Sequence, residues 1–156
     1  GPLFVQIQTI DKCNASCGMC PYSSKKTKTQ ARPMDQKLYA EILDMLKKAG
    51  TVRLLSPMLQ SEPLLDPFII DRIKLAKKVL GWETMVSIVT NGSLLTPKVA
   101  HSLVEAEIDR IEISIDAMDE GTYQKLRPGL SFSRIMENTK VFSFDAFGKG
   151  FSCQKK

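Results

Sequence analysis

Three of the four cysteines in this 156-residue chain lie close together near its N-terminus. In the stretch CNASCGMC, three residues separate Cys13 from Cys17 and two separate Cys17 from Cys20. Clustered thiols in a cytoplasmic protein indicate metal ligation more often than disulfides. The cluster does not resemble a secreted disulfide scaffold, so a cytoplasmic protein is expected. In that setting the spacing predicts a metal centre held by these three residues.

The choice of metal depends on the fourth ligand. A structural zinc site needs four ligands, often two CxxC pairs or a set that includes histidine. The single histidine, His101, falls in a predicted helix and is expected at the surface, while Cys153 lies alone in the tail. Three thiolates without a fourth protein ligand fit a cubane iron–sulfur cluster better, with one iron open to another molecule. A structural zinc protein is the alternative.

The elements that position these cysteines alternate between short apolar runs and helical stretches. Strands are predicted over 3–10, 52–56, 84–90 and 110–116, and helices over 35–49, 66–80, 96–106, 119–126 and 133–144. Asp35, Asp66-Pro67 and Thr96-Pro97 provide the start signals of the first three helices. The first helix is expected to bury one side, made of Leu38, Ile42, Met45, Leu46 and Ala49. Strands alternating with helices predict a parallel α/β sheet.

The predicted fourth strand has one apolar and one polar face. Ile111, Ile113 and Ile115 alternate with Glu112, Ser114 and Asp116. A parallel sheet covered on both faces would be apolar throughout. We therefore expect a curved sheet, an incomplete TIM-like barrel with about four βα units, around a polar cavity.

Polar residues follow every predicted strand at the same end. The cysteines follow the first strand; Gln60, Ser61 and Glu62 follow the second; Asn91 ends the third; Ser114 and Asp116 end the fourth. In parallel α/β folds the ligand site lies at the carboxyl ends of the strands. These residues are therefore predicted to share one site.

Taken in order, these motifs resemble the radical S-adenosylmethionine (radical SAM) superfamily. CxxxCxxC after the first strand is similar to the family's signature, and SEPLLDP (61–67) resembles its glycine-glycine-glutamate-proline segment. SIVTNGSLL (87–95) and ISIDAMDEGTYQKLRPG (113–129) resemble its third and fourth strand segments. CNASCGMCPYS is most similar to the SPASM-type subgroup, whose members often carry a C-terminal extension with extra clusters. The resemblance extends over residues 5–142.

This resemblance implies two cofactors. Cys13, Cys17 and Cys20 would hold three irons of a [4Fe–4S] cluster, and the amino and carboxylate groups of SAM would chelate the fourth. An electron from the reduced cluster would cleave the sulfonium bond and give a 5′-deoxyadenosyl radical that abstracts hydrogen from a substrate. The reactive chemistry would belong to the cofactors, so no residue is assigned as catalytic.

The resemblance also assigns residues to SAM. Glu62 would face its ammonium group, and Asn91 its ribose or methionine end. Ser114 and Asp116 would bind ribose hydroxyls or the carboxylate region, and Arg127 the carboxylate. The alternatives are turn chemistry for Asn91, a surface ion pair for Arg127 and a helix-approach acid for Glu62.

Three residues depart from the family pattern in the same region. Met19 replaces an aromatic residue that packs near the adenine, and Gln60 and Ser61 replace two glycines. We still expect all three to contact SAM.

The family core usually has six βα units, so a single, truncated core domain is predicted over 1–156. It would be an enzyme acting on a peptide or small molecule with an electron donor such as ferredoxin or flavodoxin. The alternative is a non-catalytic cluster- or SAM-binding module that needs a partner chain to complete its sheet. The open sheet edge would also allow a homodimer.

Charge and hydropathy narrow the range of partners. The net charge of +5 permits an anionic substrate, and the basic segment 23–32 would suit an acidic peptide. The absence of a basic stripe with interleaved aromatic residues argues against nucleic acid. No apolar run is long enough for a membrane span.

Overall fold

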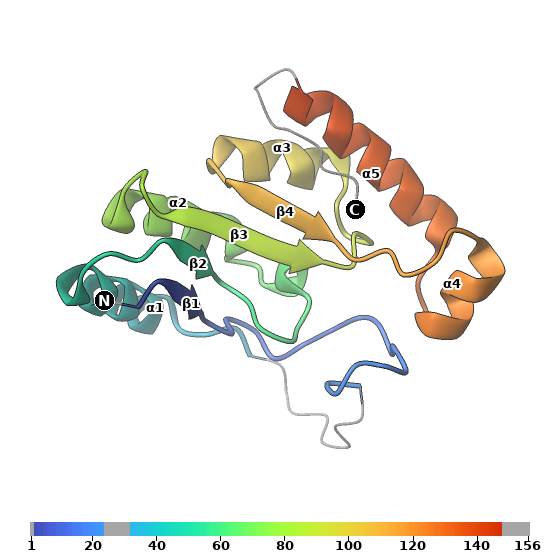
Figure 1. The fold of residues 1–156 in the computed structure, drawn as a ribbon, viewed down its shortest axis with the longest axis horizontal. Helices are drawn as coiled ribbons and strands as arrows, with labels where there is room; N and C mark the ends of the chain where they lie inside the picture. Colours follow the sequence, from blue (N-terminus) through green and yellow to red (C-terminus); the bar gives the residue numbers. More distant parts are fainter. Residues whose placement is uncertain (1, 24–31, 148–156) are drawn as a thin grey trace.

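The computed structural model describes residues 2–23 and 32–147, in which parallel strands alternate with helices (Figure 1). The strands are β1 (Phe4–Gln6), β2 (Leu54–Ser56), β3 (Met85–Thr90) and β4 (Arg110–Ile113). The helices are α1 (Gln36–Ala49), the short 3₁₀ helix η1 (Pro63–Leu65), α2 (Ile69–Leu80), α3 (Pro97–Glu105), α4 (Glu120–Leu126) and α5 (Phe132–Phe147). The predicted βα order is therefore confirmed. The basic segment, apart from its ends, and Cys153 lie outside the described residues.

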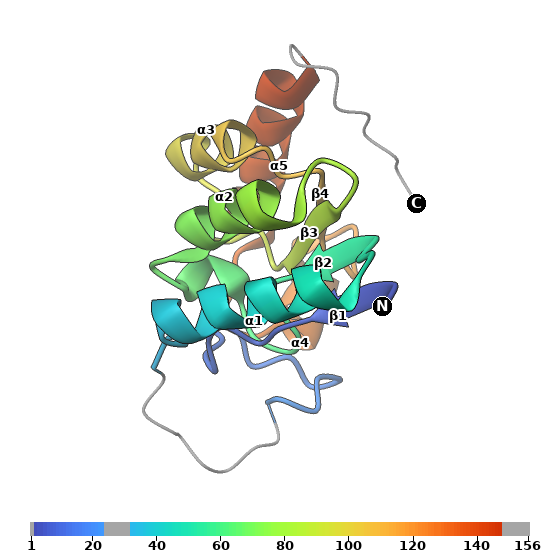
Figure 2. The same cartoon turned by 90° about the vertical axis from the view of Figure 1, so that its left-hand side faces the viewer.

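The sheet has the strand order β1-β2-β3-β4, and each strand is parallel to the one before it. Figure 2 shows α1, α2 and α3 stacked on one side of these strands. Consecutive crossovers that run in one direction place their helices on the same face, as in a barrel. The predicted partial barrel is confirmed, and the described sheet is open. No described helix has the length and apolar character that a membrane crossing requires.

The two faces of the sheet differ in polarity, as predicted. Val86 and Ile88 are fully buried in the core, where Ile111 and Ile113 also pack. Glu112 points away from this core, is exposed, and forms an ion pair with Arg110 at 3.0 Å. The polar face therefore belongs to the side that the helices leave uncovered.

All four strands are shorter than predicted, and β1 and β4 end early because the chain leaves the sheet at their carboxyl ends. The Ile7 N–H still donates to the Ser56 carbonyl at 2.9 Å, but the Gln8 side chain then turns to Asp11 at 3.1 Å. The Ser114 N–H likewise makes a last bond with the Thr90 carbonyl, at 2.9 Å. The residues that follow are released to form the loops of the site.

The buried side of α1 was predicted correctly only in part, because Ile42 and Leu46 pack against the core but Ala49 is exposed. Tyr39 and Leu43 are fully buried, whereas Leu38 and Met45 are 46% and 59% exposed. The reason is a charged group in the facing helix: the guanidinium of Arg72 lies 5.0 Å from the centre of the Tyr39 ring. A tyrosine can cover such a cation better than leucine or methionine can.

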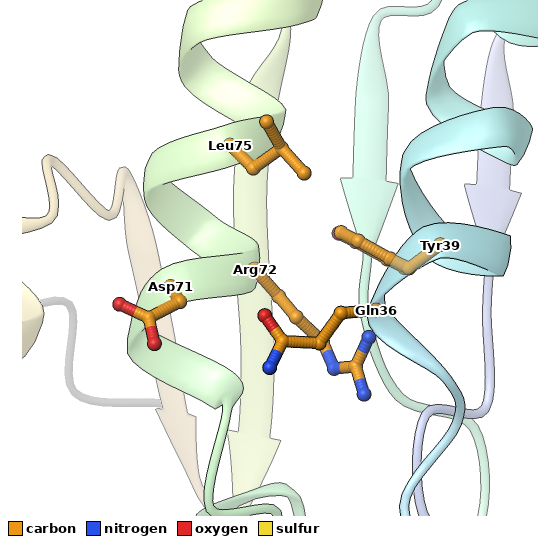
Figure 3. Close-up of a pocket in the computed structure, with 5 residues that line it drawn as sticks. All are labelled: Gln36, Tyr39, Asp71, Arg72 and Leu75. Carbon is orange, nitrogen blue, oxygen red and sulfur yellow. The ribbon is translucent and has the colours of Figure 1, made fainter.

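Arg72 is buried between α1 and α2, and Figure 3 shows it beside Gln36 and Tyr39. Its Nε donates to Asp66 Oδ2 at 2.9 Å, and its Nη2 donates to the Met34 carbonyl. Asp66 is thereby committed to Arg72 and to the Phe68 N–H, so α2 begins at Ile69, later than predicted. The pocket next to Arg72 has a volume of about 20 Å³, which is room for one water and not for a cofactor.

Candidate cofactor site at the strand ends

The three clustered cysteines are free thiols in the loop after β1. Cys17 is 6% exposed, and the other two are half-buried. Burial raises the pKa of the Cys13 thiol; the Ala15 N–H opposes this, and the charges of Glu62 and the other two thiols add to it. Within the described residues, no three His, Cys, Asp or Glu side chains gather closely enough to hold a single metal ion.

The cysteine loop is attached to three other segments. The Lys12 carbonyl accepts from the Glu62 N–H at 2.9 Å, and the Ser16 N–H donates to the Pro128 carbonyl at 3.5 Å. Asn14 lies between Lys12 and Ser16 in the sequence, and its side chain hydrogen-bonds to Asn91 at the end of β3. The loops after β1, β2 and β3 and the segment after α4 therefore converge around the thiols.

Glu62 links the loop after β2 to the end of β3. It is 2% exposed; its Oε1 accepts from Thr90 Oγ1 at 2.7 Å and its Oε2 from the Asn91 N–H at 2.8 Å. Burial raises the pKa of this carboxyl, against the effect of the same hydrogen bonds and of the charge on Arg127. Glu62 therefore holds the loop after β2 against the end of β3, in addition to its predicted role toward the ammonium group of SAM.

Asn91 and Asn14 form an amide pair that the sequence analysis did not identify. Asn91 Nδ2 donates to Asn14 Oδ1 at 2.8 Å, while Asn91 Oδ1 accepts from the Ser93 N–H at 2.9 Å. Asn14 Nδ2 in turn donates to Ser93 Oγ at 2.9 Å. Asn91 thus makes the turn expected of it and also fixes the cysteine loop. The only signal for Asn14 was its place beside Cys13, which does not reveal its partner.

Arg127 connects the fourth strand segment to the cysteines. Its Nε donates to Asp116 Oδ2 at 2.6 Å, and its Nη1 donates to Cys17 Sγ at 3.8 Å. The ion pair that was the alternative for Arg127 is present. The other side of the same guanidinium faces the thiol of Cys17. Ser114 lies half-buried at the adjacent strand end.

The remaining predicted SAM contacts differ in exposure. Gln60 is exposed, and its N–H donates to Gln8 Oε1 at 3.3 Å; Met19 is 53% exposed. Ser61 is 6% exposed, and its Oγ is without a hydrogen-bond partner among the described residues. A buried hydroxyl of this kind calls for a polar ligand or water. Free thiols and an unpartnered hydroxyl, on loops joined by the Glu62–Lys12 hydrogen bond, fit a cluster together with a polar cofactor.

The turn after β3 requires glycine at position 92. Gly92 has a φ of 76°, and an added Cβ would lie 3.0 Å from Ile113 Cγ2 and 3.2 Å from Ile135 Cγ2. Gly92→Ala is expected to lower the free energy of unfolding by about 2–3 kcal/mol, from strain and overpacking. Urea denaturation measures this. Gly121→Ala in α4, where an added Cβ makes only an ordinary contact at 3.5 Å, is the control and should not destabilise the protein. Equal stability of the two variants would contradict the argument.

Comparisons with known proteins agree with this geometry. A sequence model of the Radical SAM superfamily matches residues 7–143. GTP 3',8-cyclase from Limosilactobacillus fermentum (strain NBRC 3956 / LMG 18251) is 28% identical over 147 residues, which cover 94% of this chain and 43% of the cyclase.

Two solved structures share the fold. BtrN in complex with AdoMet and 2-DOIA matches with a TM-score of 0.63 and 25% identity, over 86% of this chain and 54% of BtrN. Streptococcus suis SuiB bound to precursor peptide SuiA matches with a TM-score of 0.75 and 21% identity, over 92% of this chain and 30% of SuiB. The likeness to SuiB concerns the fold alone. This chain therefore spans about half or less of each of these three proteins.

Proposed function

Because the chain belongs to the radical SAM superfamily, we propose that Cys13, Cys17 and Cys20 bind a [4Fe–4S] cluster and that the adjoining strand ends bind SAM. The superfamily is one of enzymes that use these two cofactors. When bound, they supply an electron and a 5′-deoxyadenosyl radical that abstracts hydrogen from a substrate. The observation that carries the proposal is the convergence of the free thiols with the loops after β2 and β3.

The residues around the thiols bind and orient. The Lys12–Glu62 and Asn14–Asn91 contacts hold the cysteine loop against the sheet, which limits the positions that the thiolates can take. The unpartnered hydroxyl of Ser61 is a donor for SAM.

Six further residues are proposed to surround SAM as the sequence analysis assigned them. These are Met19, Gln60, Asn91, Ser114, Asp116 and Arg127. Glu62 would face the ammonium group with the lone pair on Oε2 that its three hydrogen bonds leave free. The burial of this carboxylate supports the assignment, because a charge pair is stronger where water is excluded.

The substrate proposal stays at the level of a peptide or small molecule. The cyclase relative takes its name from a nucleotide, and SuiB was solved with a peptide, but each is longer than this chain. The net charge of +5 favours an anionic substrate. We also propose a cytoplasmic location, an electron donor such as ferredoxin or flavodoxin, and a homodimer through the open sheet edge.

We also propose a subgroup within the superfamily and a second candidate function. The stretch CNASCGMCPYS favours the SPASM-type subgroup. A non-catalytic cluster- or SAM-binding module is the second candidate function, favoured by the open edge of β4, because a partner chain could complete the sheet there.

The test is reconstitution without oxygen. Iron and sulfide are measured per chain, then SAM and a strong reductant are added and 5′-deoxyadenosine is quantified by chromatography. We expect about four irons per chain and production of 5′-deoxyadenosine. Iron without turnover would favour the module, and zinc without iron would contradict both functions.

A further inference from the structure

We propose that Arg127 is a positioning residue that donates a hydrogen bond to the cluster ligand Cys17 and thereby raises the reduction potential of the cluster. This inference rests on the proposed function, because it takes Cys17 as a ligand. It differs from the role toward the SAM carboxylate that the family resemblance assigned to Arg127, since it requires no SAM.

The contact joins a cation to a buried sulfur. Arg127 Nη1 lies 3.8 Å from Cys17 Sγ, with its N–H directed at the sulfur. The side chain of Arg127 is 13% exposed, and Cys17 is 6% exposed. Water therefore screens this contact weakly, and a charged donor acts strongly on a thiolate in such surroundings.

Asp116 fixes the orientation of the guanidinium. Its Oδ2 accepts from Arg127 Nε at 2.6 Å and lies 2.5 Å from Nη2 in the ion pair, so one side of the fork is occupied and Nη1 is left for Cys17. The Arg127 N–H also donates to the Tyr123 carbonyl at 2.8 Å, which holds the residue at the end of α4. The Asp116 side chain is 39% exposed, so solvent screens its negative charge more than it screens the arginine.

The surroundings of Cys17 contain a second polar group. The Tyr123 hydroxyl is buried, has no hydrogen-bond partner among the described residues, and belongs to the cluster of side chains that packs around Cys17. Both side chains come from α4 and its C-terminal cap. Arg127, at the cap of this helix, thus contacts the ligand sulfur directly, and Tyr123 adds a second polar group to the packing around Cys17.

The effect on the potential follows from charge. A one-electron reduction by an external reductant adds one negative charge to the cluster and its thiolates, and no bond is broken in this step. A positive donor at the Cys17 sulfur stabilises the reduced state more than the oxidised state, so the potential becomes more positive.

The experiment is a redox titration of the reconstituted protein without SAM, followed by electron paramagnetic resonance of the reduced cluster. Arg127→Gln is expected to shift the midpoint to a more negative potential. Lys125→Gln is the matched control, because it removes the same charge from an exposed position in α4 and should leave the midpoint close to that of the wild type. Arg127→Lys keeps the charge without the planar fork and should shift the midpoint in the same direction by less.

The outcomes separate this inference from the proposed function. A wild-type protein that binds no cluster overturns both. A normal cluster whose midpoint is unchanged in Arg127→Gln, or equally shifted in Lys125→Gln, overturns only the role of Arg127. If circular dichroism shows that Arg127→Gln is unfolded, Arg127→Lys decides: a negative shift supports the directed hydrogen bond, and the wild-type midpoint overturns it.

Discussion

Replacing Cys17 with alanine is expected to abolish stable binding of the [4Fe–4S] cluster. The substitution leaves two thiolates, Cys13 and Cys20, for a cluster that needs three ligands from this loop. Cys17 is the most buried of the three, so water would enter poorly as a substitute ligand. Iron and sulfide per chain after anaerobic reconstitution should fall to near zero, and the absorbance of the cluster should disappear with them.

A matched variant tests whether the loss comes from ligation. Cys153→Ser removes the fourth cysteine, which stands alone in the sequence, and should retain the full iron content. The alanine side chain fits the apolar surroundings of Cys17, so the fold should persist in circular dichroism at a cost of about 1 kcal/mol. Full iron in Cys17→Ala, or an equal loss in Cys153→Ser, would contradict the assignment of the ligands.

Replacing Glu62 with alanine is expected to give the largest loss of stability among these variants, about 4 kcal/mol. The carboxylate is 2% exposed and accepts hydrogen bonds from Thr90, Asn91 and Leu64. Its removal leaves these three donors without an acceptor and opens a cavity between the loop after β2 and the end of β3. Urea denaturation of the protein without cofactors measures the free energy of unfolding directly.

Two further variants serve as comparisons for the stability of Glu62→Ala. Glu62→Gln keeps the volume and one acceptor oxygen, but its amide would face a backbone N–H, so an intermediate loss of about 2 kcal/mol is expected. Glu41→Ala removes an exposed carboxylate from α1 and should change stability by about 0.5 kcal/mol or less. A Glu62→Ala variant as stable as Glu41→Ala would show that the anchor contributes little.

Several features of this protein followed from the sequence because they depend on neighbouring residues. Asp35 accepts from the Leu38 N–H at 3.0 Å and starts α1 as predicted, and Thr96 with Pro97 starts α3. The alternation in β4 placed its isoleucines toward the core and Glu112 away from it. Periodicity and caps are local properties, so they revealed the parallel sheet and the edge where its loops meet.

The sequence did not reveal the partners of the site residues, because those lie far apart along the chain. Arg127 and Cys17 are 110 residues apart, and Asn91 and Asn14 are 77 apart. Glu62 was predicted to face a ligand, yet much of its hydrogen-bonding capacity is used by Thr90 and Asn91. The buried side of α1 depended in the same way on Arg72 in the next helix. Sequence determined which residues gather at the strand ends, whereas tertiary packing decided the distances and therefore which of them bond to one another.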